Sequence, residues 1–336
     1  MTVYANPGAP PEVAVSTKPS VPRPVRFAAL GDSLTAGVGD RVDGGWRGWA
    51  VLLAEALGTA DGDVGRPVGR TSRRPGGRPG RKAPSPAGAE PAPVFRNFAT
   101  SGALTRDVRE RQAPAALAFA PDIASVVVGV NDTLRRAFDI AAIARALDEV
   151  CAALTTRGTV LLTACLPDPG IMLGLPAPLA RPLARRQRAV NALSHELSAR
   201  YGAVHLHAAD PEWVADRSLW SADRLHPGER GHRMIAAQFH AMLTARGLTL
   251  GPPPPQEPER PQPTRTEALL WMATAGAGWM VRRSTDLLPE LLWLAGSEMR
   301  HLARGTATRL DARAEHALSR ALTALPPVTP LARMGE

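Results

Sequence analysis

The stretch FAALGDSLTAG, residues 27–37, decides the fold expected for this chain. Its first four residues are apolar and predict a short buried strand that ends at Gly31. Asp32 and Ser33 follow directly, and Gly37 loosens the turn after them. Open parallel sheets bind their ligands beyond the carboxyl ends of their strands. The stretch therefore places the Ser33 hydroxyl where a functional site is expected.

Strand and helix patterns alternate along the next two hundred residues. Segment 123–130, IASVVVGV, is a continuous β-branched run, so it predicts a central strand covered on both faces. The alternation predicts a parallel sheet of about five strands with helices on both sides, a three-layer α/β/α fold. The expected strands are 27–30, 94–98, 123–130, 159–166 and 203–207, and the expected helices are 46–57, 105–117 with an interruption at Pro114, 140–154, 179–201 and 228–243.

The chain has 336 residues, of which 44% are hydrophobic, enough for one large domain and an extension. Its 33 prolines are clustered, which indicates linkers between folded parts. The predicted organisation is a disordered tail over 1–24, an α/β domain over 25–248 with a flexible insertion at 59–93, a Pro-rich linker over 249–263, and a helical extension over 264–336.

The net charge of +9 comes largely from the insertion. Seven basic residues and no acid lie between positions 64 and 82: Arg66, Arg70, Arg73, Arg74, Arg78, Arg81 and Lys82. We interpret this segment as a solvated loop, because it has almost no large apolar side chain. The alternative is an electrostatic contact with nucleic acid or anionic lipid. Since no aromatic residue lies among the arginines to stack on bases, the sequence disfavours nucleic acid.

Two cysteines, Cys151 and Cys165, are too few for a disulfide framework and are expected to be buried thiols. His205 and His207 alternate on a predicted strand, a spacing that metal ligands also show. No cluster of carboxylates or cysteines joins them in the sequence, so we expect no metal there. His195, His232 and His240 are expected to be structural or exposed.

Three further blocks carry polar side chains that suit catalysis. They are NFATSG (97–102), GVND (129–132) and DRLHP (223–227). The first two end predicted strands, and the third precedes the last helix of the α/β domain. In a parallel sheet these positions converge on the edge where Ser33 lies.

A serine hydroxyl becomes a good nucleophile only when a base removes its proton. His226 is the candidate base, and Asp223, three residues earlier, can hold the far nitrogen of its ring. The backbone N–H groups of Ser33 and Gly102, with the Asn131 amide, can donate to the oxyanion of a tetrahedral intermediate. Asp32 is expected to hold its loop by hydrogen bonds.

The four blocks, in content and order, resemble those of the SGNH or GDSL serine hydrolases over residues 27–227. The resemblance implies a flavodoxin-like α/β/α fold and ester hydrolysis. It implies that Ser33, Gly102, Asn131 and His226 are the four named positions of the family and that Asp223 is the triad acid. It implies neither metal nor nucleotide cofactor.

The expected function is hydrolysis of carboxylic esters through an acyl-serine intermediate. A short-chain ester, a lysophospholipid and an acetylated sugar all remain open as substrates. An acyltransferase and a carbohydrate deacetylase would use the same residues, so they stay as alternatives. A non-catalytic membrane- or partner-binding protein is a third reading, which the presence of Ser33, Asp223 and His226 disfavours.

Two apolar segments, 267–281 and 287–295, predict a helical hairpin in the C-terminal extension. The uncharged run 268–281 has 14 residues, too few to span a bilayer. We expect residues 268–295 to pack on the α/β domain or on a second copy. The alternative is an interfacial helix pair with peripheral membrane contact. The first fifteen residues lack a signal-peptide pattern, so a cytoplasmic location is expected.

Overall fold

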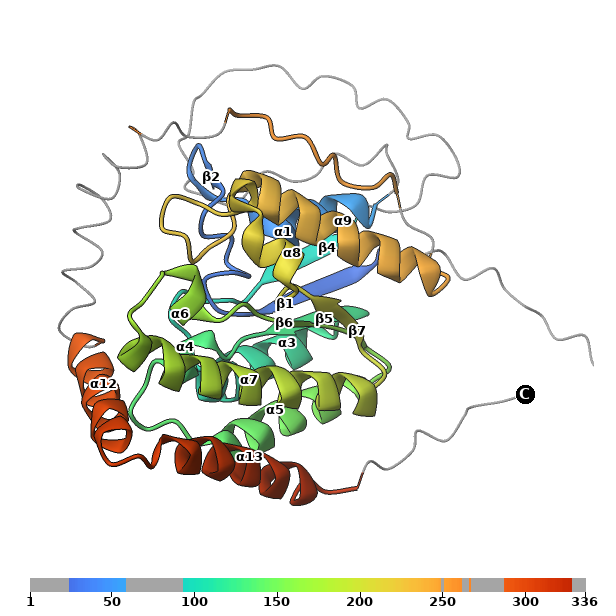
Figure 1. Ribbon diagram of the computed structural model, residues 1–336. Helices are drawn as coiled ribbons and strands as arrows, with labels where there is room; N and C mark the ends of the chain where they lie inside the picture. The colour runs from blue at the N-terminus through green and yellow to red at the C-terminus, as the bar shows by residue number, and fades with distance from the viewer. Residues whose placement is uncertain (1–23, 59–92, 249–250, 262–265, 267–286, 328–336) are drawn as a thin grey trace, which may run out of the picture.

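The computed structural model describes residues 24–58, 93–248, 251–261, 266 and 287–327. Within them, five parallel strands form one sheet, as predicted (Figure 1). Their order across the sheet is β4 (Val94–Asn97), β1 (Arg26–Gly31), β5 (Ile123–Val127), β6 (Val160–Cys165) and β7 (Val204–His207). From β1 the chain first forms β4 on one side and then β5 on the other, so the order of the strands switches direction at β1. This switch point is where open α/β sheets bind ligands, and Ser33 follows β1 directly.

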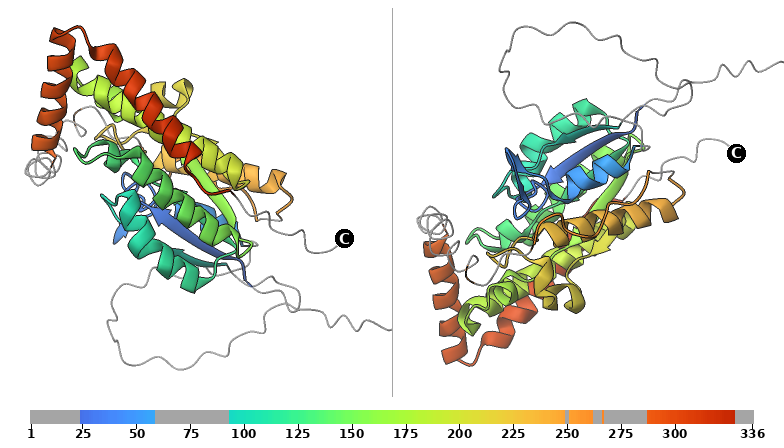
Figure 2. Two further views of the ribbon diagram at one scale, coloured as in Figure 1. Left: turned by 90° about the horizontal axis from the view of Figure 1, so that it is seen from below. Right: turned by 90° about the horizontal axis from the view of Figure 1, so that it is seen from above.

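Helices cover both faces of the sheet, which confirms the three-layer fold (Figures 1 and 2). Alternate residues of β1 point to opposite faces of the sheet. Phe27 and Ala29 belong to one apolar cluster, and Ala28 and Leu30 belong to the other. The first cluster is closed by α1 (Gly48–Ala56) and α9 (Glu229–Ala245). The second is closed by α3 (Ala113–Phe119), α5 (Ile140–Thr155) and α7 (Ala177–Arg200). Short helices fill the connections: α4 (Val130–Thr133), α6 (Pro169–Met172), α8 (Pro211–Ala215) and the 3₁₀ turn η2 (Arg217–Leu219).

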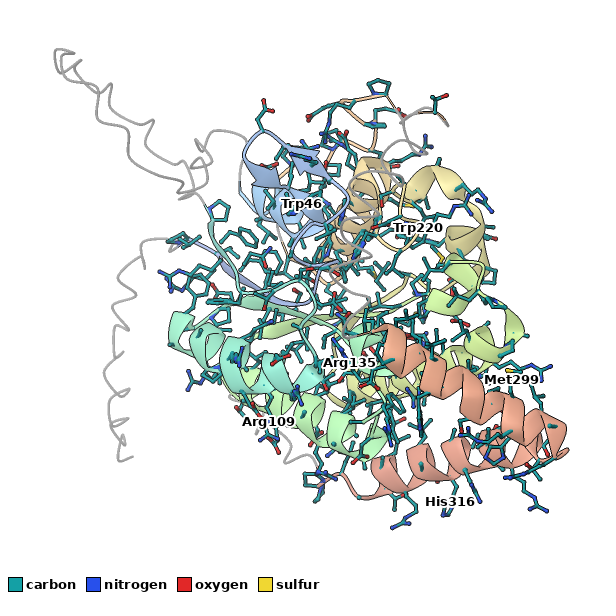
Figure 3. All side chains as sticks on the ribbon, turned by 90° about the vertical axis from the view of Figure 1, so that its left-hand side faces the viewer. Trp46, Arg109, Arg135, Trp220, Met299 and His316 are labelled. Atoms are coloured by element: carbon teal, nitrogen blue, oxygen red, sulfur yellow. The ribbon has the colours of Figure 1, made fainter. Side chains whose placement is uncertain are left out.

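The helix predicted from Trp46 begins later, at Gly48. Residues 41–42 (β2) and 45–46 (β3) pair as a small antiparallel hairpin instead. Gly44, at φ +94°, permits the tight turn between them. Trp46 is consequently exposed rather than part of the helical apolar face (Figure 3).

The predicted interruption at Pro114 is wrong. Helix α2 (Thr105–Asp107) continues through a π-helical turn, η1 (Val108–Gln112), directly into α3. Pro114 comes just after the π turn, and the helix continues through it to Phe119. Single π turns recur at functional sites, and this one ends on Gln112, which contacts the strand before Ser33.

Two C-terminal helices, α12 (Leu288–Ala303) and α13 (Ala307–Thr323), pack outside α7 and α5 (Figure 2). Leu294 and Ala321 are buried in these contacts. Arg185 of α7 pairs with the buried Glu298 of α12 at 3.1 Å and with Asp311 of α13 at 2.7 Å. Arg185 is therefore largely shielded from solvent, because the extension covers that face of α7.

Residues 251–261, within the predicted linker, lie against the α/β domain. Glu259 pairs with Arg233 at 2.6 Å and with Arg47 at 3.0 Å. Arg260 pairs with the fully buried Asp40 at 2.7 Å. Ion pairs thus fix this segment across the loop after β1 and the start of α9.

The predicted N-terminal tail, the basic insertion and the first apolar segment of the hairpin lie outside the described residues. Among the helices that the structure describes, none has the length and apolarity required to cross a bilayer.

Candidate active site

Ser33 lies in a helical turn that begins where β1 ends. The Ala36 N–H donates to the Asp32 carbonyl at 2.9 Å, and the Val38 N–H donates to the Ser33 carbonyl at 3.0 Å. Gln112, the last residue of η1, forms two hydrogen bonds with the end of β1. Its Oε1 accepts from the Gly31 N–H at 2.8 Å, and its Nε2 donates to the Gly31 carbonyl at 2.9 Å. The buried Gln112 side chain therefore fixes both the N–H and the carbonyl group of Gly31, two residues before Ser33.

The structure brings Ser33, His226 and Asp223 into one chain of hydrogen bonds. The Ser33 Oγ lies 2.7 Å from His226 Nε2, and His226 Nδ1 lies 2.7 Å from Asp223 Oδ2. The other carboxylate oxygen of Asp223 accepts from Ser221 Oγ at 2.6 Å and from the His226 N–H at 3.0 Å. Burial by itself would raise the pKa of Asp223, but the hydrogen bonds and the charge of His226 hold it well below its usual range. Asp223 is thus an ionised acceptor for the imidazole.

The loop carrying His226 touches the loop carrying Ser33 at Gly39. A Cβ at this position, where φ is +107°, would lie 1.9 Å from the Pro227 carbonyl oxygen. The His226 loop is itself tied back, because the Ser221 N–H donates to the His226 carbonyl at 2.8 Å. Only glycine at position 39 allows the two loops to approach this closely.

Gly102 and Asn131 lie after the strands on either side of β1. Gly102 adopts φ +83° in the turn after β4, and Asn131 lies in α4, just after β5. Within the described chain, neither the Ser33 nor the Gly102 backbone N–H donates a hydrogen bond. The Asn131 amide, by contrast, donates to the Ala103 carbonyl at 3.1 Å and to Asp32 Oδ2 at 3.3 Å. Asn131 must release one of these acceptors before it can donate to a reacting oxygen.

Two buried carboxyl groups support this site. Burial raises the pKa of Asp32 to about 6, against the opposing hydrogen bond from the Leu34 N–H. Burial also raises the pKa of Asp132 to about 6, although its carboxylate accepts from the Thr105 hydroxyl at 2.8 Å. Asp132 thereby joins α4, which carries Asn131, to the start of α2. The expected role of Asp32, holding its loop by hydrogen bonds, agrees with its contacts to Leu34 and Asn131.

Sequence reasoning missed the contributions of Gln112 and His232. His232 is buried, accepts from the Trp49 N–H through Nδ1 at 3.2 Å and bonds the Val38 carbonyl through Nε2 at 3.0 Å. It joins α9, α1 and the Ser33 loop. Neither residue belongs to a motif, and each is recognisable only once its distant partner is in place.

The expectation of no metal at His205 and His207 rested on the sequence alone, in which no cluster of carboxylates or cysteines joins them. Cys165 and His195, remote in the sequence, lie beside them in the structure, and the four side chains form a group able to hold a metal ion. Both cysteines are buried thiols, as predicted.

A hollow of about 390 Å³ lies between α7 and the C-terminal helices. Arg186, Trp293 and Leu294 contribute to its lining, whereas Ser33, Asp223 and His226 do not. The hollow is therefore separate from the Ser33, His226 and Asp223 side chains.

Several solved structures are similar to this chain. One is a mutant of Axe2, an acetyl-xylooligosaccharide esterase from Geobacillus stearothermophilus, at 14% identity and a TM-score of 0.46, covering 66% of this chain and 95% of that chain. Another is LAE5, an α/β hydrolase from the metagenome of Lake Arreo, Spain, at 18% identity and a TM-score of 0.46, covering 68% of this chain and 100% of that chain. A third is the esterase EstA from Pseudoalteromonas sp., at 16% identity and a TM-score of 0.44, covering 67% of this chain and 99% of that chain.

A search of curated proteins gave no match. The sequence does match the GDSL-like Lipase/Acylhydrolase family over residues 67–234, half of the chain. The matched range contains Gly102, Asn131, Asp223 and His226, and the GDSL stretch itself lies before it. This chain belongs to the GDSL-like lipase/acylhydrolase family.

Proposed function

We propose that the protein hydrolyses carboxylic esters with Ser33 as nucleophile, His226 as general base and acid, and Asp223 as the acid that orients the imidazole. The observation that carries the proposal is the continuous hydrogen-bonded chain from Ser33 Oγ through His226 to Asp223 Oδ2, with both links at 2.7 Å. Each distance lies within the reach that proton transfer requires.

In the first half-reaction the Ser33 oxygen attacks the ester carbonyl carbon while its proton passes to His226 Nε2. The imidazolium that forms is stabilised by ionised Asp223 at Nδ1. The carbonyl oxygen becomes an oxyanion, for which the unengaged N–H groups of Ser33 and Gly102 are suitable donors. When the tetrahedral intermediate collapses, the alkoxide leaves with the proton from His226 and the acyl group stays on Ser33.

In the second half-reaction a water molecule attacks the acyl carbon and gives its proton to His226. A second tetrahedral intermediate collapses, the carboxylic acid departs, and the Ser33 oxygen regains its proton from His226. An alcohol in place of water would give acyl transfer with the same residues. Family membership supports acyl hydrolysis as the reaction class.

The test measures turnover of p-nitrophenyl esters of increasing chain length by wild type, Ser33→Ala and His226→Ala. Each substitution should lower kcat at least ~10³-fold while the protein remains folded. Ser319→Ala, an exposed serine on α13, is the matched control and should keep full activity. The panel also orders the acyl chains, so a sharp preference for acetate would remove lipid-like substrates.

A fluorophosphonate probe separates catalysis from mere binding. It should label wild type at Ser33 and leave Ser33→Ala unlabelled. Equal labelling of both would contradict the proposal and favour a non-catalytic role. Product analysis with added alcohol distinguishes transfer from hydrolysis.

A further inference from the structure

Four metal-ligating side chains meet at the sheet edge formed by β6 and β7. Cys165 ends β6 and is the register partner of His207 on β7. His205 lies two residues earlier on β7, and His195 reaches both from α7, with ring centroids 4.4 Å from His205 and 5.0 Å from His207. One ligand atom from each of the four residues lies within 4.8 Å of the others.

The ring of His205 is held by two buried hydroxyls. Its Nδ1 lies 2.9 Å from both Thr163 Oγ1 and Ser198 Oγ, which are themselves 2.7 Å apart. Ser198 donates to the Ser194 carbonyl at 2.5 Å, so its own proton is committed. All of these contacts are satisfied if Thr163 donates to Ser198 and the protonated Nδ1 of His205 donates to the hydroxyl oxygens.

That arrangement leaves the lone pair on His205 Nε2. This atom is buried and has no hydrogen-bond partner in the part of the chain that the structure describes. A buried polar atom without a partner costs free energy, and a metal ion would supply the missing bond. Metal-binding histidines usually have their second ring nitrogen fixed by a hydrogen bond, and the two hydroxyls supply such a bond here.

Asp210 follows the cluster in the chain, and its N–H donates to the His207 carbonyl at 3.3 Å. Its carboxylate would offset part of the charge of a bound cation.

We propose that Cys165, His195, His205 and His207 bind one Zn²⁺ ion as a four-coordinate site. One thiolate and three imidazoles are a ligand set that suits zinc. Bond lengths of about 2.0–2.3 Å place neighbouring ligand atoms of a tetrahedral zinc site about 3.3–3.7 Å apart, so these side chains need to close by about an ångström. On binding, the Cys165 S–H proton leaves to solvent and the thiolate forms the metal bond. The exposed His207 gives the ion access from outside.

The protein supplies all four ligands, so this site is structural rather than catalytic. It would tie the edge strand β7 to β6 and α7. After β7 the chain runs through α8 and η2 to Asp223 and His226, so zinc would secure the start of the segment that carries the proposed acid and base. The zinc site and the proposed hydrolysis stand independently, because no ligand belongs to the Ser33–His226–Asp223 chain.

The test uses full-length, tag-free protein stripped with a chelator and titrated with Zn²⁺ in competition with a chromophoric chelator. Wild type should bind one Zn²⁺ per chain, and zinc should raise its Tm. Co²⁺ in the same site should give the intense visible bands of a tetrahedral ion and a thiolate charge-transfer band. Cys165→Ser should lose the charge-transfer band, and Cys165→Ser and His207→Ala should each weaken Zn²⁺ binding by more than about tenfold.

His207→Ala changes an exposed side chain, so it keeps the test decisive if Cys165→Ser fails to fold. His316→Ala, an exposed histidine on α13, is the matched control and should bind zinc like wild type (Figure 3). Absence of binding by wild type would overturn the proposal. Equal binding by wild type, Cys165→Ser and His207→Ala would overturn it too, since the metal would then lie elsewhere, as at the triad imidazole.

Discussion

At the scale of single residues, Asp32 is an acid buried beside the nucleophile. Its raised pKa, about 6 because of burial, means that the folded protein holds a proton there that the unfolded chain releases near the ordinary value of 3.8. A group whose folded pKa is raised lowers stability as pH rises from its unfolded to its folded value. Ionised Asp32 therefore reduces stability while placing a negative charge near His226.

We predict that Asp32→Asn changes the pH dependence of folding. Between pH 4.5 and pH 8, wild type should lose about 2 kcal/mol of stability relative to the variant, because asparagine has no proton to release. Urea unfolding of both proteins at the two pH values measures this difference. The same stability difference at both pH values would show that Asp32 is ionised across the whole range.

The Asn131 amide donates to the Ala103 carbonyl and to Asp32, so the proposed donation to an oxyanion requires it to exchange one of these acceptors. We predict that Asn131→Ala lowers kcat by ~10²–10³ with little change in KM, because a donor to the oxyanion acts mainly in the transition state. Steady-state kinetics on one p-nitrophenyl ester provide the measurement. A rise in KM at unchanged kcat would instead make Asn131 a substrate-binding residue.

At the scale of elements, α12 is held on α7 by a buried charge. Glu298 is 1% exposed and is paired with Arg185, which is partly buried. Leu288, Leu292 and Met299 of α12 are exposed, and Met299 is labelled in Figure 3. Contact of residues 268–295 with a second copy, and the alternative of a membrane contact, stay predictions made from the sequence.

We predict that Glu298→Ala destabilises the protein by about 2–4 kcal/mol, because Arg185 loses a bidentate partner in a partly buried site. Chemical denaturation of full-length protein measures the change. Arg300→Ala, an exposed residue on the same helix, should change stability by less than about 0.5 kcal/mol. Equal effects of the two substitutions would mean that the Arg185 pair contributes nothing beyond helix propensity.

At the scale of the whole molecule, His232 connects three elements that the sequence keeps far apart. Burial lowers its pKa to about 4, with the Val38 carbonyl and Asp40 opposing and with His226 and Arg47 adding to the decrease. A histidine held neutral in the fold gives stability that is present at neutral pH. This stability is lost as pH falls from the ordinary value of 6.5 toward 4, because the unfolded chain gains the proton first.

We predict that acidification from pH 7 to pH 5 costs wild type about 1–2 kcal/mol more stability than it costs His232→Gln. The variant should be weaker at pH 7, since the contacts to Trp49 and Val38 change, so the slope with pH is the relevant quantity. Thermal or urea unfolding across this range measures it. His316→Gln should keep the wild-type slope, and a His232→Gln slope equal to that of wild type would contradict the prediction.

Much of this architecture is predictable because local patterns report local structure. The run 27–30 is wholly apolar and the run 123–127 has Ser125 as its single polar residue, so a sheet covered on both sides accommodates them best. Strand ends in a parallel sheet converge, so Ser33, Asn131 and the block after β4 could be placed at one edge before any coordinates. Two local predictions were wrong: a small hairpin occupies residues 41–46, where the helix was expected to begin at Trp46, and the helix continues from a π turn through Pro114 without a break.

The sequence by itself determined where the strands and helices lie, that the sheet is covered on both faces, and which residues carry the proposed chemistry. These features follow from apolar spacing and short motifs. Only the tertiary structure decided that Gln112 and His232 fix the Ser33 loop, that Arg185 is paired with Glu298, and that Cys165 and His195 join His205 and His207. Such contacts link residues tens to hundreds of positions apart. Their distances depend on how the layers pack, which no local pattern in the chain encodes.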